Sequence, residues 1–196
     1  MAQASPDPAT LSAPRPKRLL IDRLETPIGT ALIVTDELGV LRAFDWSDHD
    51  ERLRRLMRRY YGSVPVADGP APAKVREALS AYFAGDIRAL EGLQWSSSGT
   101  AFQLSVWRAL CDIPVGQTIS YAELARRIGR PKAVRAVGLA NGANPIGLIA
   151  PCHRVIGANG TLTGYGGGLH RKRWLLRHEG ASWREDRAEP EQVALI

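Results

Sequence analysis

Three short apolar runs near the start of the chain constrain the fold more than any other feature. They are RLLIDRLET (18–26), GTALIVTDE (29–37) and GVLRAFDW (39–46), and the segments TPIG and ELG between them carry turn residues. Runs of this kind joined by such turns suit an antiparallel meander. Two helical patterns follow, over 48–62 and 73–86, with apolar residues at helical spacing: Leu53, Leu56, Met57 and Tyr60, then Val75, Leu79 and Phe83. The first half therefore predicts an α/β (α+β) structural domain over 18–97.

The second half predicts a mostly helical domain over 98–182, starting after WSSSGT (95–100). Thr100 is placed to begin one helix, which must end by Pro114. In SYAELARRIGRPKAVRAVGLANG (120–142), Ser120 and Glu123 form a capping-box pattern, Gly129 ends the helix and Pro131 suits the first turn of another. The outline is that of a helix-turn-helix, although any helical hairpin resembles it. Residues 1–17 and 183–196 read as flexible tails.

The charge of the chain is unevenly distributed. Residues 1–98 carry 13 Lys and Arg against 13 Asp and Glu, whereas residues 99–196 carry 13 against 7, so the whole net charge of +6 lies in the second half. Such a basic region predicts a polyanionic partner, with nucleic acid favoured over membrane because no amphipathic anchor accompanies it. The alternative is a merely soluble basic surface.

The second helix of the hairpin has an unusual composition for a helix that recognises a specific DNA sequence. It is made largely of small residues such as Ala136 and Gly138, and Arg135 is its one long cation. Base-edge discrimination usually needs several Arg, Asn or Gln side chains. Small residues instead let the helix backbone approach a surface closely, which predicts DNA gripped by backbone and shape.

The cysteine content argues against disulfides and a structural metal. Cys111 and Cys152 are the two cysteines of the chain, and neither forms a CxxC or HxxxH pattern with His49, His153, His170 or His178. We therefore expect no metal, a reducing cytoplasmic setting and neither a signal peptide nor a membrane span. Cys111 lies in an apolar helical pattern, where a free cysteine behaves as a small hydrophobe.

Cys152 and His153 stand side by side in PCHRV (151–155). Successive side chains diverge, so a direct thiol–imidazole contact is difficult. A thiol is a nucleophile only as thiolate, and with an ordinary pKa of ~8.5 it needs a base. A water bridging thiol and imidazole would meet that need, and Glu179 is the best-placed acceptor for the other ring nitrogen by elimination. The alternative is a buried structural thiol.

These motifs together carry a family resemblance. RAVGLANGANP, PCHRV and LTGYGGG lie within a stretch, Gly99 to Gly180, that closely resembles the catalytic domain of the O6-alkylguanine-DNA alkyltransferases, also called methylated-DNA–protein-cysteine methyltransferases. The first half resembles the small α/β domain of that family through TPIG and AYFAGD. The resemblance implies repair of duplex DNA by direct reversal, once per molecule and without a cofactor.

The resemblance also implies roles for individual residues. Cys152 would accept the alkyl group from O6 of guanine, and from O4 of thymine, through a water-bridged relay to His153 and Glu179. Asn144 would hold the turn beside the nucleophile, Tyr121 would press on the phosphate next to the lesion, and Arg135 would fill the gap left by the flipped nucleotide. The substrate pocket would include Tyr165, as donor to the guanine, the backbone around Cys152 and Val155, and the glycine loop with Gly166.

Two other functions compete with this interpretation. A non-catalytic binder of alkylated DNA could recruit other repair factors, but such a binder needs no thiolate. A cysteine hydrolase is disfavoured because Cys152 and His153 are adjacent and the surroundings suit a polyanion. We expect a monomer with no obligate protein partner.

Overall fold

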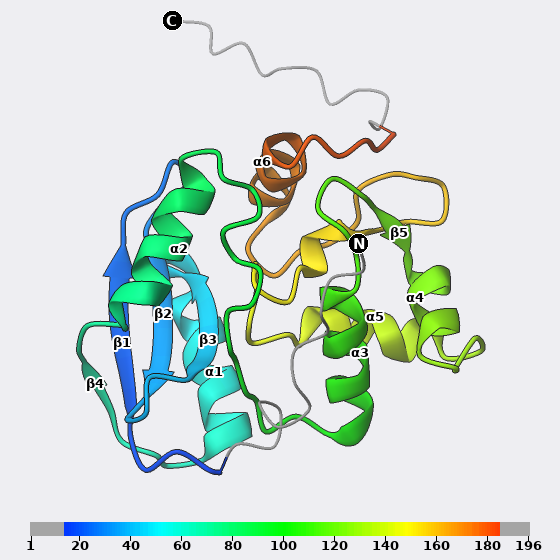
Figure 1. Ribbon diagram of the computed structural model, residues 1–196. Coiled ribbons are helices and arrows are strands. Elements are labelled where there is room, and N and C mark those ends of the chain that lie inside the picture. Colours follow the sequence, from blue (N-terminus) through cyan, green and yellow to red (C-terminus); the bar gives the residue numbers. More distant parts are fainter. Residues whose placement is uncertain (1–13, 185–196) are drawn as a thin grey trace, which may run out of the picture.

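The structure of the protein is a computed structural model that describes residues 14–184 (Figure 1). A sheet covered by two helices lies on one side, and the helices of the second half lie on the other. Most of the two predicted tails falls on 1–13 and 185–196, which lie outside the described residues.

The N-terminal sheet has four strands in the order β3-β2-β1-β4. Its strands are β1 (Leu19–Leu24), β2 (Ala31–Asp36), β3 (Leu41–Trp46) and β4 (Val66–Asp68). The pairs β1–β2 and β2–β3 are antiparallel, which confirms the predicted meander. Strand β4 adds to β1 in parallel, so the sheet is mixed. This strand gave no sequence signal because its three residues are all exposed and show no alternation.

Two helices follow the meander, as the periodicity predicts. Helix α1 (Asp50–Tyr61), which comes after the short helix η2 (Ser47–His49), buries every residue of its predicted apolar stripe. Helix α2 (Ala73–Phe83) buries Val75 and Leu79, but Tyr82 is its third buried residue and Phe83 is only partly buried. A tyrosine inside the core must satisfy its hydroxyl, and the partner of Tyr82 proves to be in the second half of the chain.

The second half consists of short elements around a compact hairpin. They are α3 (Ala101–Cys111), β5 (Ile119–Ser120), α4 (Tyr121–Arg127), α5 (Val134–Gly142), η3 (Cys152–Arg154), β6 (Val155–Ile156) and α6 (Leu169–His178). Thr100 caps α3 in a complete capping box with Gln103, and the Ser120 side chain caps α4. The predicted restart at Pro131 is early, since α5 begins only at Val134.

Contacts between the two halves are extensive. The backbone N–H of Phe44 on β3 donates to the carbonyl of Pro145 at 2.9 Å, and Phe44 also forms a bridge with Ile146. One hydrophobic cluster runs from the sheet through Trp95 and Trp107 to Cys152. The division into domains at residue 97 stays a prediction, and the loop with Pro145 and Ile146 lies against the sheet half.

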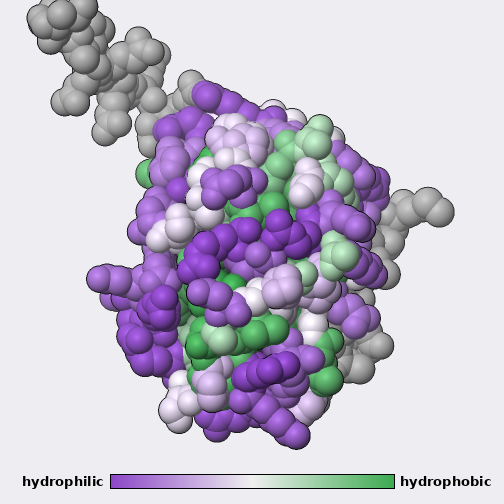
Figure 2. All heavy atoms as spheres, turned by 90° about the vertical axis from the view of Figure 1, so that its left-hand side faces the viewer, coloured by the Kyte–Doolittle hydropathy of each residue, from purple (hydrophilic) through white to green (hydrophobic). Residues whose placement is uncertain are grey.

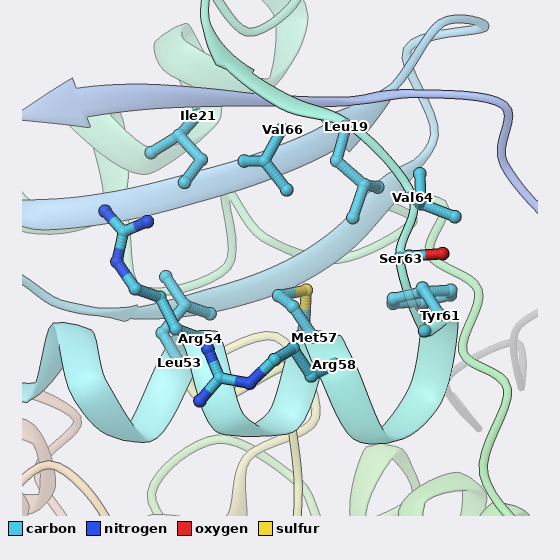
Figure 3. A pocket seen from close by; sticks show the side chains of 11 residues that line it. Leu19, Ile21, Leu53, Arg54, Met57, Arg58, Tyr61, Ser63, Val64 and Val66 are labelled. Carbon is cyan, nitrogen blue, oxygen red and sulfur yellow. The ribbon is translucent and has the colours of Figure 1, made fainter.

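The outer side of the sheet half is mostly hydrophilic. Figure 2 shows apolar patches between the polar side chains on the side where β1 and β4 lie. A pocket opens between these strands and α1, with Leu19, Met57 and Val66 in its wall and Arg54 and Arg58 projecting beside them (Figure 3). None of the predicted site residues lines it. Within residues 14–184, no helix has the length and apolar character needed to cross a membrane.

Candidate active site around Cys152

The turn that carries Cys152 is built around Asn144. The side-chain amide of Asn144 donates to the carbonyl of Ala150 at 2.8 Å, and its Oδ1 accepts from the backbone N–H of Ile146 at 3.0 Å. Asn144 is 1% exposed, so these bonds close the loop from inside. Leu148 adopts φ 69° within the same loop, a costly conformation for a leucine that the closed turn maintains. Cys152 follows as the first residue of η3 and is buried.

His153 and Glu179 meet as the sequence predicted. The Nε2 atom of His153 lies 3.0 Å from Oε1 of Glu179, and both side chains are completely buried. Because a carboxylate only accepts, Nε2 must carry the proton, and Nδ1 is left with a lone pair. Nδ1 is buried and has no hydrogen-bond partner among the described residues. The imidazole is therefore oriented to accept a proton at Nδ1, while its Nε2–H donates a hydrogen bond to Glu179.

Arg154 is a further member of this group that sequence analysis left in a surface charge count. Its Nε donates to Oε2 of Glu179 at 2.8 Å, its Nη2 to Oε1 at 3.0 Å, and its Nη1 to the carbonyl of Ile113 at 2.6 Å. The two-point contact is the strong geometry for an arginine–carboxylate pair. Arg154 thus holds the carboxylate that orients His153.

Burial and these contacts set the protonation states of the relay. Burial by itself raises the pKa of Glu179, but His153 and Arg154 outweigh it and hold the pKa well below its usual range. Burial lowers the pKa of His153 despite the opposing effect of Glu179, so the imidazole is neutral at neutral pH. Burial raises the pKa of the Cys152 thiol, and a hydrogen bond from Asn144 opposes that rise only in part. The site therefore combines a protonated thiol with a neutral base.

Two more cations of the basic second half, Arg171 and Lys172, are also buried. Arg171 is 5% exposed and Lys172 0%. Arg171 pairs with Asp48 of the first half, and Nζ of Lys172 donates to the carbonyls of Val155 at 2.7 Å and Thr163 at 3.0 Å. The positive surface is thus smaller than the charge count indicated, because Arg171, Lys172 and Arg154 are buried and form hydrogen bonds inside the protein.

Tyr165 lies on the other side of His153, with the ring centres 6.4 Å apart. Burial raises the pKa of its phenol well above the ordinary value, so Tyr165 stays protonated and able to donate. The glycines after it allow close packing against the first half. A Cβ on Gly166 would lie 2.6 Å from Nη2 of Arg52, and one on Gly167 would lie 2.6 Å from Nε1 of Trp46. The loop is therefore glycine-rich partly because the first half presses against it.

Arg52 on α1 also joins the halves at this point. Its guanidinium pairs with the buried carboxylate of Asp45 and donates to the carbonyls of Gly142 at 3.0 Å and Asn144 at 3.1 Å. Sequence analysis assigned no role to Arg52, because its two partners in the second half, Gly142 and Asn144, are some ninety positions away along the chain. It braces the turn that precedes Cys152.

The predicted DNA-contacting residues lie together on the helical hairpin. Arg135 and Ala136 are exposed on α5, and the partly buried Gly138 packs under the ring of Tyr121 on α4. The Tyr121 hydroxyl accepts from Oγ1 of Thr163 at 3.3 Å, which connects the hairpin to the loop before Tyr165. Leu139 is 71% exposed beside them, an apolar residue on this face that sequence analysis did not identify.

Val155 is a predicted pocket residue whose backbone is already engaged. Its carbonyl accepts from Lys172 and its N–H donates to the carbonyl of Cys152. If the backbone of Val155 forms hydrogen bonds to a base, its N–H and carbonyl must do so while they keep these hydrogen bonds or after they give them up. Its role in the pocket stays a prediction.

Known proteins are similar to this chain in both sequence and structure. Residues 101–181 match the family described as 6-O-methylguanine DNA methyltransferase, DNA binding domain. Over 165 residues, 83% of this chain and 96% of the relative, the chain is 47% identical to the methylated-DNA–protein-cysteine methyltransferase of Salmonella typhimurium. The chain belongs to the methylated-DNA–protein-cysteine methyltransferase family. Its α+β fold class is confirmed as well, because the O6-methylguanine methyltransferase of Mycobacterium tuberculosis superposes with a TM-score of 0.66 at 40% identity, covering 83% of this chain and 93% of that one.

A second structure of the Mycobacterium tuberculosis protein includes bound DNA. The Mycobacterium tuberculosis protein in complex with DNA superposes with a TM-score of 0.67 at 40% identity, over 83% of this chain and 92% of that one. Since 83% of the chain is covered, the match extends into both halves of it. Within residues 14–184 of the present chain, no group of three or more His, Cys, Asp or Glu side chains is able to hold a metal ion.

Proposed function

We propose that this protein repairs alkylated duplex DNA by moving the alkyl group from O6 of guanine, and from O4 of thymine, onto Cys152. The observation that carries the proposal is the buried Cys152 beside a neutral His153 whose second nitrogen is held by Glu179. The family to which the chain belongs performs this class of reaction on DNA. The same arrangement supplies a nucleophile, a base and a group that orients the base.

The chemistry needs the thiol proton to leave as the alkyl group arrives. A water hydrogen-bonded to both groups would take the proton from Sγ of Cys152 and pass one to Nδ1 of His153. The thiolate then attacks the alkyl carbon, the S–C bond forms and the C–O6 bond breaks. Its electron pair goes to the guanine, where the Tyr165 hydroxyl donates a hydrogen bond to the developing anion. The S–C bond of the resulting thioether is stable and is not cleaved again, so each chain acts once.

The hairpin would deliver the base to Cys152. An atom inside a duplex is out of reach, so the damaged nucleotide must be flipped, at a cost of a few kcal/mol. Arg135, exposed on α5, would occupy the gap, while Tyr121 would press on the neighbouring phosphate. The small residues Ala136 and Gly138 would let α5 approach the minor groove closely. Asn144 would keep the turn of Cys152 in place beneath the extruded base.

We also propose that the protein acts as a monomer in the cytoplasm. Both cysteines are free, which agrees with a reducing compartment. The reaction as written needs no partner protein and no cofactor.

The test is to incubate the protein with duplex DNA that contains O6-methylguanine and to measure its intact mass. We expect a gain of one methyl group per chain, mapped to Cys152 by peptide analysis. Cys152→Ala should abolish the gain, and Cys111→Ala should keep it, because burial raises the pKa of Cys111 to about 12 and the thiol lies in α3. An unchanged mass with DNA still bound would support the non-catalytic binder instead.

A further inference from the structure

Two successive residues at the end of α6 hold one tyrosine of the first half. The hydroxyl of Tyr82, on α2, donates to Oε1 of Glu179 at 2.8 Å. The neighbouring His178 donates from Nε2 to the backbone carbonyl of Tyr82 at 2.6 Å, and the two rings meet edge to face at 5.0 Å. Tyr82 is 0% exposed. His178 thus holds the backbone and the ring of Tyr82, and the hydroxyl is directed at the carboxylate of Glu179.

The oxygen that Tyr82 contacts is the one that orients His153. Oε1 of Glu179 accepts from His153 at 3.0 Å, from Arg154 at 3.0 Å and from Tyr82 at 2.8 Å, whereas Oε2 accepts from Arg154 at 2.8 Å. Donors on one oxygen share its electron density, so each weakens the bond to the others. Tyr82 therefore both fixes the position of Oε1 and limits its attraction for the proton on His153.

We propose that Tyr82 is a positioning residue of the methyl-transfer relay, through which the sheet half of the protein tunes the base His153. The inference rests on the proposed function, since it assumes that Cys152, His153 and Glu179 act as described. In this view the first half does more than support the fold. It supplies a donor that positions Oε1 of Glu179 and limits the attraction of that oxygen for the proton on His153.

The charged and titratable groups around His153 determine the sign of the effect. Glu179 faces Nε2, Arg154 and Lys172 lie nearby as cations, and Cys152 and the Tyr165 ring complete the surroundings. Glu179 raises the pKa of His153, whereas Arg154 and Lys172 lower it. Removing the Tyr82 hydroxyl leaves both cations in place and gives His153 a larger share of Oε1. The pKa of His153 should therefore rise, and its neutral, reactive fraction should fall at acidic pH.

The experiment measures single-turnover methyl transfer from a duplex with O6-methylguanine, using the full chain and its Tyr82→Phe variant from about pH 5 to pH 9. We expect the acidic limb of the variant to move upward by roughly half to one pH unit, so that rates below the midpoint fall about three- to tenfold while rates at high pH converge. Loss of a purely structural hydrogen bond would lower stability without moving the midpoint.

Tyr61→Phe is the matched control. Tyr61 is also 0% exposed, but its hydroxyl donates to the carbonyls of Ser96 at 3.2 Å and Arg42 at 3.4 Å, away from Glu179. Its midpoint should equal that of the unaltered chain. If Tyr82→Phe does not fold, 3-fluorotyrosine at position 82 tests the proposal instead. Its hydroxyl is more acidic and nearly isosteric, so the stronger donor should move the midpoint of the acidic limb to lower pH.

The outcomes separate the two proposals. Coincident pH profiles for Tyr82→Phe and the unaltered chain, with methyl still transferred to Cys152, would overturn the role of Tyr82 alone. A midpoint that moves as far in Tyr61→Phe, or an unmoved midpoint with 3-fluorotyrosine, would overturn it equally. Absence of methyl transfer by the unaltered chain would instead overturn the proposed function.

Discussion

Arg52→Met should destabilise the protein through a charge buried at the contact between its halves. Arg52 is 18% exposed and pairs with Asp45, whose side chain is 3% exposed, and it also donates to the carbonyls of Gly142 and Asn144. Methionine keeps much of the aliphatic length but leaves the carboxylate without its cation. Asp45 would retain a hydrogen bond from the backbone N–H of Trp46 at 3.0 Å.

The magnitude follows from the burial of the pair. Removing one partner of a buried ion pair costs about 3 to 5 kcal/mol, and water that reaches the partly exposed guanidinium favours the lower end. We therefore expect a loss of about 3 kcal/mol at neutral pH. For a chain of this length that corresponds to a fall in Tm of roughly 6 to 12 °C. Asp45→Asn in the same chain should recover part of the loss, because no unpaired charge remains.

The loss should also depend on pH. Burial already raises the pKa of Asp45, and removal of Arg52 raises it further. Folded Asp45 then binds a proton where the unfolded chain does not, so the free energy of unfolding falls as pH rises through that window. The variant should accordingly come closest to the unaltered protein near pH 4, about the pKa of an unfolded aspartate.

Thermal and urea unfolding of the free protein would measure these effects. Arg54→Met is the control on the same helix, because Arg54 is 54% exposed in its pair with Asp50 and should cost no more than about 0.5 kcal/mol. A fall in Tm for Arg52→Met no larger than that of Arg54→Met would refute the reasoning. So would a loss that is the same near pH 4 as at neutral pH.

Two further predictions concern a buried lysine and the DNA-facing helix. Burial lowers the pKa of Lys172 to about 8, so the folded chain binds fewer protons than the unfolded chain between that pH and roughly 10.4, and the free energy of unfolding should rise with pH across this window. Urea unfolding should show this rise in the unaltered chain relative to Lys172→Met, and equal pH slopes for the two would contradict it. Arg135→Ala should slow methyl transfer from duplex DNA about tenfold or more, because Arg135 is proposed to fill the gap left by the flipped nucleotide, while transfer from a free O6-alkylguanine base stays unchanged. A proportional loss on both substrates in a single-turnover assay would show that Arg135 acts on the chemistry instead.

Much of the local structure could be predicted from the sequence. The three strands of the meander, α1, α2 and α3 all form where alternation, helical spacing and the Thr100 cap indicated. These signals are local, because a buried face repeats every two or about 3.6 residues along the chain. The pairing of His153 with Glu179 was also predicted, since few acids occur in the basic half. Strand β4 was not predicted, because three exposed residues carry no such repeat.

By itself, then, the sequence indicated most of the longer helices and strands, and it predicted the nucleophile and the residues of the relay. Only the tertiary structure decided how that relay is held: Tyr82 on Glu179, Arg52 on the loop of Asn144, and Trp46 against the glycines after Tyr165. It also placed Arg154, Arg171 and Lys172 in the interior, although the charge count included all three in the basic second half. The physical reason is that a side chain's partner, burial and protonation depend on which distant segments fold against it. Tyr82 and Glu179 are 97 positions apart, a separation at which no local pattern carries information.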